Sequence, residues 1–245
     1  MTMLRVMHAV LLIPVIAVPA CRAGGQEPPR HGHPAVVASR VPMGTERLAV
    51  MLQSDTITRR LGEYAITVGP AERDGRSLLL VTQVMTLPNA AVVDSMWLSP
   101  TTLFPLEATA SSPSGRTVLH YSSTAIRGER VAPDGTRSPI EITTNSPVFA
   151  ASVLGVLVQA LPLTRGLHFT VPVHSDPEGV VDASVYVTGE EQLPGSHQPA
   201  WRIELQVGEH RAIKWVDTVT RREVRTEADL PGGRRLIQMS LGTAG

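Results

Sequence analysis

Apolar and polar residues alternate along several stretches of the chain. Residues 181–188 place three valines and an alanine on one face and polar side chains on the other, and residues 201–207 repeat the pattern. A period of two is typical of antiparallel strands with one buried face. Further segments of this kind, punctuated by glycine-containing turns, are 63–69, 77–86, 91–98, 103–110, 116–123, 125–132, 137–144, 167–174, 209–217, 222–229 and 234–241. Strands joined by short turns predict an antiparallel meander.

Residues 147–163 break this pattern, because they carry no charged side chain and few polar ones. Asparagine and serine before Pro147 can cap a helix, and Pro162 can end it. The segment is short for a membrane span, and a helix that is apolar on all sides is normally buried. We therefore expect a helix at 147–161 under the concave face of a curled sheet, with Gly155 where the helix backbone comes close to the sheet.

An internal repeat supports this arrangement. Residues 97–122 and 215–240 align without a gap and are identical at seven of 26 positions, among them Trp97 with Trp215 and a Gly-Arg turn in each copy. Turn residues shared by chance are the alternative, but a matching tryptophan and turn in one register favour a true repeat. The expected fold is mainly β: a curled antiparallel meander, or half-open barrel, wrapped around one central α-helix, with pseudo-repeated hairpin units.

Three segments together resemble a bacterial envelope family, the domain of unknown function 3108. They are Trp97–Pro105, Pro147–Gly166 and Trp215–Leu241. The resemblance covers most of residues 56–241. It implies an exported, often lipid-anchored protein with a fold like that of the lipoprotein-localisation proteins, a half-open antiparallel barrel closed by helix and able to hold acyl chains. It implies no catalytic residue.

The N-terminal segment is typical of export. Residues 1–20 combine a basic residue, an apolar run and small residues at the end, as secretory signals do. Cys21 follows in a sequence that resembles the bacterial lipoprotein box, so we expect acylation at Cys21 and a membrane anchor; a secreted protein with a free thiol is the alternative. Arg22 favours the periplasmic face of the outer membrane. Residues 21–44 would be a flexible tether, and residues 45–245 a single β-rich half-barrel domain.

Composition excludes several classes of function. Lys and Arg together number 22, as do Asp and Glu, so no basic excess points to nucleic acid. A single cysteine excludes a disulfide framework and a zinc site of the Cys-pair kind. His31 and His33 lie in the tether and make a poor metal site by themselves. We expect no metal and no cofactor. Lys214 is the one lysine beside 21 arginines.

Candidate site residues are few, because no complete hydrolase, metalloprotease or nucleotide-binding motif is present. Large aromatic side chains can line the mouth of a cavity around an apolar ligand, with core packing as the alternative. The candidates for such a binding role are Trp97, Phe149, Trp201 and Trp215.

The sequence therefore favours a non-catalytic envelope lipoprotein that binds a lipid or other apolar molecule, or that docks with an envelope partner whose identity stays open. The alternatives are a hydrolase of cell-envelope material and a purely structural surface protein with a filled core. An apolar cavity without convergent titratable groups favours binding, whereas histidines and carboxylates clustered in a cleft favour catalysis.

Overall fold

The computed structural model describes residues 36–176, 178–194 and 198–242. Cys21, His31 and His33 therefore lie outside the described residues. The first part of the fold is a meander of eight strands: β1 (Gly44–Ser54), β2 (Ile57–Arg73), β3 (Arg76–Leu87), β4 (Ala90–Leu98), β5 (Pro105–Ser112), β6 (Gly115–Tyr121), β7 (Ala125–Val131) and β8 (Arg137–Thr143).

The second part consists of a short helical segment and seven more strands. In chain order these are β9 (Phe149–Ala150), the 3₁₀ turn η2 (Ala151–Val153), α2 (Leu154–Ala160), β10 (His168–Ser175), β11 (Gly179–Glu191), β12 (Ala200–Val207), β13 (His210–Asp217), β14 (Glu223–Leu230) and β15 (Arg234–Ser240). A further 3₁₀ turn, η1 (Ala38–Arg40), precedes β1.

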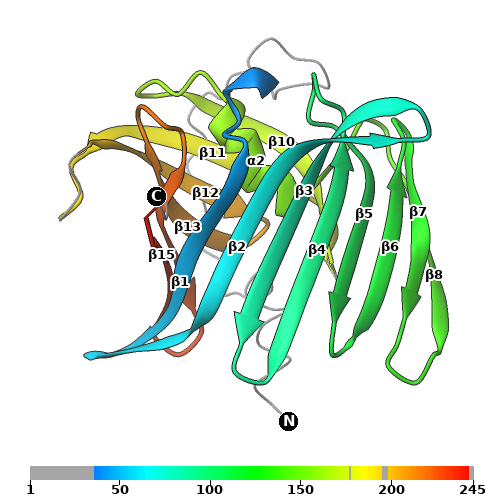
Figure 1. Cartoon of the computed structure of the whole chain (residues 1–245), viewed down its shortest axis with the longest axis horizontal. Coiled ribbons are helices and arrows are strands. Elements are labelled where there is room, and N and C mark those ends of the chain that lie inside the picture. Colours follow the sequence, from blue (N-terminus) through cyan, green and yellow to red (C-terminus); the bar gives the residue numbers. More distant parts are fainter. Residues whose placement is uncertain (1–35, 177, 195–197, 243–245) are drawn as a thin grey trace.

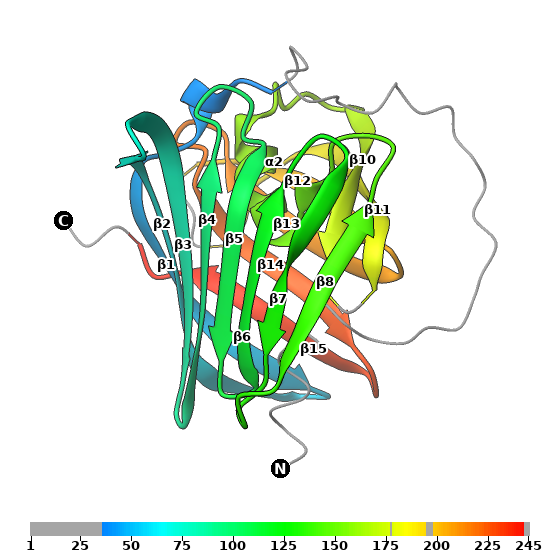
Figure 2. The same ribbon diagram turned by 90° about the vertical axis from the view of Figure 1, so that its right-hand side faces the viewer.

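All fifteen strands belong to one sheet. Its order is β8-β7-β6-β5-β4-β3-β2-β1-β15-β14-β13-β12-β11-β10-β9, so the first and last strands of the chain join the two meanders. Neighbours are antiparallel except β9, which pairs in parallel with β10. The sheet curls so that α2 lies inside it, between the two meanders (Figures 1 and 2). The predicted fold class, a curled antiparallel meander around one helix, is confirmed.

The helix is shorter than the sequence predicts. Phe149 and Ala150 pair with Val173 and His174 as strand β9, so their peptide groups serve the sheet and cannot be helical. A 3₁₀ turn follows, and Val153 is the N-cap of α2 without a side-chain hydrogen bond, so the caps expected before Pro147 are wrong. The helix ends where expected, because a residue before proline disfavours the helical conformation and Leu161 is extended.

The internal repeat is confirmed in the backbone. Strands β4–β5–β6 and β13–β14–β15 are its two copies, and both carry a register shift directly after the tryptophan, Trp97 or Trp215. In the turn that follows, Leu103 and Arg221 occupy equivalent positions with φ of 58° and 62°, a left-handed conformation that costs a non-glycine residue roughly 1–2 kcal/mol. Because two non-glycine residues at equivalent positions of the repeat both adopt this rare conformation, the two copies share one turn geometry.

The folded part also takes in residues that we assigned to the tether. Ala38 and Val41 are buried in the main core, and the backbone N–H of Val37 donates to the carbonyl oxygen of Ala160 at 2.9 Å. Strand β1 begins at Gly44 and was absent from the predicted strands. The alternation of apolar and polar residues is weak at the start of β1. Its pairing with β2 and β15 depends on tertiary structure rather than on the local sequence.

The main core lies between the concave face of the sheet and the segment 148–163. Fully buried members include Leu48 of β1, Met96 of β4, Leu157 of α2 and Ile203 of β12. The predicted contact of this segment with strands of both repeat copies is confirmed: the hydroxyl of Ser152 in η2 contacts the sulfur of Met96 on β4 at 3.0 Å, and the ammonium of Lys214 on β13 lies beside Gly155 of α2. The helix therefore closes the core of both meanders.

Candidate functional site

Two neighbouring cavities lie between the concave face of the sheet and the helical segment. The first, of about 270 Å³, is lined by residues of β2–β4 and β12–β15 and by α2. We call it the lysine cavity, because Lys214 lines it. The second, of about 490 Å³, lies under β4–β7 and contains His174 in its wall, so we call it the histidine cavity. Val92, Asp94, Ala151 and Ser152 line both cavities, which are therefore adjacent.

A buried polar network forms one wall of the lysine cavity. The ammonium of Lys214 donates to the Glu223 carboxylate, and the side chains are 9% and 2% exposed. The hydroxyl of Thr226 donates to the other oxygen of Glu223 at 2.6 Å. On the same face, Gln159 of α2 donates to Glu46 of β1 at 3.3 Å. The network thus ties the helix, β1, β13 and β14 together in the interior.

Burial changes the acid–base behaviour of this wall. Desolvation raises the pKa of the Glu46 carboxyl; the backbone N–H of Glu223, which donates to it at 3.1 Å, opposes that shift. The pKa of the Tyr64 hydroxyl is raised well above its usual value, chiefly by desolvation and further by the nearby Glu223 charge. Tyr64 therefore stays neutral and lines the cavity as a hydrogen-bonding group rather than as an anion.

Side chains bridge the two ends of the open sheet at the histidine cavity. The rings of Tyr121 on β6 and His174 on β10 meet edge to face with centroids 6.5 Å apart. Arg130 of β7 forms an ion pair with Asp176 after β10. Burial lowers the pKa of the His174 imidazole, although the charge of Asp176 works in the opposite direction. His174 is therefore held neutral in the seam between the sheet ends.

The four aromatic candidates are not brought together. Trp97 and Trp215 lie on the convex face, since their neighbours Met96 and Val216 point into the core and side chains alternate along a strand. Trp201 packs against the main core, and the ring of Phe149 meets Phe104 with centroids 5.9 Å apart. None of the four lines either of the two cavities. Their role in ligand binding stays a prediction.

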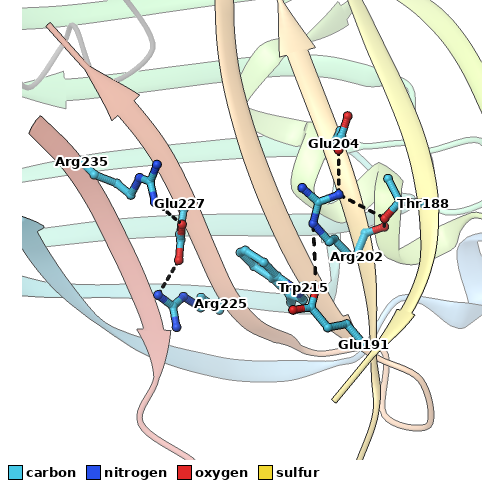
Figure 3. Close-up of polar contacts among 8 residues, drawn as sticks. All are labelled: Thr188, Glu191, Arg202, Glu204, Trp215, Arg225, Glu227 and Arg235. Carbon is cyan, nitrogen blue, oxygen red and sulfur yellow. Dashed lines mark hydrogen bonds and ion pairs between the residues drawn. The ribbon is translucent and has the colours of Figure 1, made fainter. Parts of the chain in front are cut away.

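Trp215 is the centre of a polar cluster on the convex face (Figure 3). Its indole N–H donates to Glu191 at 2.9 Å, and the guanidinium of Arg225 lies 5.7 Å from the ring centroid. Arg202 donates to Glu204 at 2.6 Å and to the hydroxyl of Thr188 at 3.3 Å. Each charged group faces an opposite charge, either along its own strand, as Arg202 faces Glu204, or across to the next, as Arg235 faces Glu227, so this cluster is a network of ion pairs.

Trp97 has a similar environment in the other repeat copy. The guanidinium of Arg73 lies 5.2 Å from its ring centroid and 2.8 Å from Glu107. Arg73 lies on β2, whereas Arg225 lies on β14. The two copies therefore place an arginine over the tryptophan ring from strands that are not equivalent. Cation–π contacts of this kind contribute roughly 0.5–1 kcal/mol, and Trp215 is also buried against Leu193 and Ala200. Structure therefore accounts for both convex-face tryptophans without a ligand.

Sequence reasoning missed the residues that line the cavities. Lys214 occupies an inward position of β13 between Ala212 and Val216, so a charge interrupts the hydrophobic face of an otherwise regular strand. That interruption, and the rarity of lysine in the chain, were the available signals. Glu46 and Glu223 carried no comparable signal, because both lie at the start of their strands, where a charge is usually solvated.

The described residues hold no group of three or more His, Cys, Asp or Glu side chains placed to bind a metal ion. In the same part of the chain, no helix is long and apolar enough to cross a membrane. The described residues form one mainly antiparallel sheet that curls around an internal helix, and two adjacent cavities lie on its concave side.

Comparison with known proteins places the chain in a family. The family described as "Protein of unknown function (DUF3108)" matches residues 50–240, and the chain belongs to it. No curated protein matches the chain. One solved structure, a LolA superfamily protein from Nitrosomonas europaea, is similar over 84% of this chain and 92% of its own, with 11% sequence identity and a TM-score of 0.22. A likeness of that degree carries no argument about ligand or activity.

Proposed function

We propose that this protein is an exported, lipid-anchored envelope protein that holds an apolar ligand, such as an acyl chain, between the concave face of its sheet and α2. The observation that carries the proposal is the pair of adjacent cavities of about 270 and 490 Å³ under the helix. Cavities of several hundred Å³ lined mainly by apolar groups are typical of small-molecule sites.

The lining supports an apolar ligand. Ile66, Met85 and Leu205 contribute to the lysine cavity, and Met96 and Leu119 to the histidine cavity. An empty apolar cavity costs stability, because its walls lose contact with partner atoms. A bound hydrocarbon chain would restore those contacts. The proposal includes no catalytic step, and the carboxylates of Glu46 and Glu223 are held by donors within the fold.

A cavity-filling variant at Gly155 tests the proposal. A Cβ atom at this position would meet only the Lys214 nitrogen, at 3.7 Å, so the close backbone approach that we expected here is wrong. Gly155→Leu should fill the lysine cavity, whereas Gly155→Ala should leave it open and stabilise the helix by roughly 0.5–1 kcal/mol.

The measurement is binding of the uncharged fluorophore N-phenyl-1-naphthylamine, together with native mass spectrometry of protein purified from its own membrane. We expect a co-purifying lipid and probe binding in the wild type and Gly155→Ala, and much weaker binding in Gly155→Leu. Equal probe binding by all three proteins, with no lipid bound to any, would sink the proposed site.

The anchor has its own test. The Cys21→Ser variant should move from the detergent phase to the aqueous phase in Triton X-114 partitioning, because several acyl chains on the cysteine would supply the stable membrane attachment. Outer-membrane fractions should likewise lose the protein. A variant that partitions as the wild type does would contradict the lipoprotein assignment and leave the cavity proposal standing.

A further inference from the structure

Lys214 is a buried cation with unused donors. Its side chain is 9% exposed, and its ammonium has one hydrogen-bond partner among the described residues, the Glu223 carboxylate. An ammonium carries three N–H donors. The remaining donors lie where the side chain lines the lysine cavity, beside Gly155 of α2. The acceptor for these donors comes from outside the fold, either from water or from a ligand in the cavity.

The carboxylates around Lys214 are, by contrast, satisfied. Glu223 accepts from Lys214 and, at 2.6 Å, from Thr226. Glu46 accepts from Gln159 at 3.3 Å and from the backbone N–H of Glu223 at 3.1 Å, and the guanidinium of Arg222 lies 3.7 Å away. The carboxylates of Glu46 and Glu223 are thus held by donors of the fold, whereas Lys214 still has N–H groups to offer a ligand.

The charges of the site decide what kind of acceptor fits. Lys214 in the cavity wall and Arg222 next to the cavity already face the carboxylates of Glu223 and Glu46, whereas Arg211, which also lines the cavity, is exposed to solvent. Beside Lys214, a further anion would enter a poorly solvated part of the site in which both cations are already paired, and Asp94 adds a negative group to the same cavity wall. An uncharged oxygen avoids this penalty and still accepts a charge-assisted hydrogen bond.

The adjacent histidine cavity supplies room for an apolar tail. It shares part of its wall with the lysine cavity and extends along Met96, Ala108 and Leu119. We propose, building on the proposed function, that the ligand is a neutral acylated molecule whose ester or amide carbonyl accepts a hydrogen bond from Lys214 while its hydrocarbon chain occupies the histidine cavity. Lys214 is then the residue that distinguishes an acyl ester from a plain hydrocarbon.

Matched probes test this assignment in the full-length protein. 1-Monopalmitoylglycerol and 1-O-hexadecylglycerol have the same headgroup and chain length, but only the first has a carbonyl. Both, and palmitate as the charged analogue, compete against N-phenyl-1-naphthylamine below their critical micelle concentrations. A hydrogen bond from a charged donor corresponds to about tenfold or more in affinity, so the ester should bind at least about tenfold more tightly than the ether.

The double variant Lys214→Met/Glu223→Gln removes both charges together, which avoids leaving one buried without a partner. It should bind ester and ether equally, at the wild-type affinity for the ether. Equal binding of ester and ether by the wild type would overturn the role of Lys214 and leave the apolar site intact. Palmitate as the tightest ligand would overturn the uncharged acceptor. Failure of all three to displace the fluorophore, or of the fluorophore to bind, would instead remove the proposed function.

Discussion

Strand β13 presents two charged environments on opposite faces, one residue apart. On the concave side, Lys214 and Glu223 form a pair whose side chains are 9% and 2% exposed. On the convex side, around Trp215, Arg202 pairs with Glu204 and Arg235 with Glu227 in positions that solvent reaches (Figure 3). Both faces pair a basic side chain with a glutamate, and the sheet separates the two environments.

The difference in solvent access gives the two clusters different roles. Exposed ion pairs contribute about 0–1 kcal/mol, because water and salt screen them. A buried pair gains little over an apolar replacement, but removal of one partner costs about 3–5 kcal/mol. A protein that keeps a buried lysine in its core therefore bears a cost that function can explain, whereas the convex cluster requires no function beyond holding the strands together.

The largest effect should come from placing an unpaired charge under the concave face. Leu157 of α2 is fully buried, so Leu157→Asp should unfold the domain, by desolvating a carboxylate and losing the leucine contacts. Val219, in the turn after β13, is 72% exposed, and Val219→Asp is the matched control. Thermal melts followed by circular dichroism check both. A Leu157→Asp melt equal to that of the wild type would show that the helix is peripheral.

Breaking the buried pair should have the next largest effect. Lys214→Met leaves the Glu223 carboxylate buried without its cation and should lower the free energy of unfolding by about 3–5 kcal/mol. Lys214→Met/Glu223→Gln should recover most of that loss. Urea unfolding at neutral pH measures the three proteins. A single variant as stable as the double variant would mean that Glu223 finds another partner or becomes protonated.

The seam between the sheet ends should respond to pH. Burial lowers the pKa of His174 in the folded state, so below the unfolded-state value of about 6.5 the unfolded chain binds the proton first. The free energy of unfolding should therefore fall as pH drops from 7.5 to 5.5, and His174→Gln should lessen that fall. His120→Gln, at an imidazole on the convex face that is 61% exposed, is the control. Urea unfolding at both pH values measures the free energy of unfolding of the three proteins. The same decrease between pH 7.5 and pH 5.5 in all three would contradict an effect of His174 burial.

The smallest effect should come from the convex cluster. Arg235 lies 3.0 Å from Glu227 and 2.8 Å from Asp229, but its side chain is 44% exposed. Arg235→Gln should lower the free energy of unfolding by no more than about 1 kcal/mol, and less at high salt. Urea unfolding at low and high ionic strength measures this. If Arg235→Gln lowered the free energy of unfolding as much as Lys214→Met does, the ion pairs of the two faces would not differ in their contribution to stability.

Local patterns were sufficient to predict most of the fold. Alternation along 181–188 and 201–207 reports directly which side chains are buried, because the period of a strand is two. The repeat was visible because a tryptophan and a Gly-Arg turn recur at one offset, and the structure adds a left-handed residue at equivalent places, Leu103 and Arg221. The helix was located correctly at its proline-limited end but not at its start, since pairing of Phe149 with β10 depends on a strand that comes later in the chain.

The sequence by itself determined most of the strands and turns, the apolar helical segment and the expectation of an exported, anchored chain, because each depends on neighbouring residues. Only the tertiary structure decided that β1 pairs with β15, and so that Glu46 reaches Gln159 and the backbone of Glu223. It also decided that Lys214 points into a cavity while Trp215 points to the convex face. Those outcomes depend on how far the sheet curls, and curvature is a sum over all fifteen strands rather than a property of any one segment.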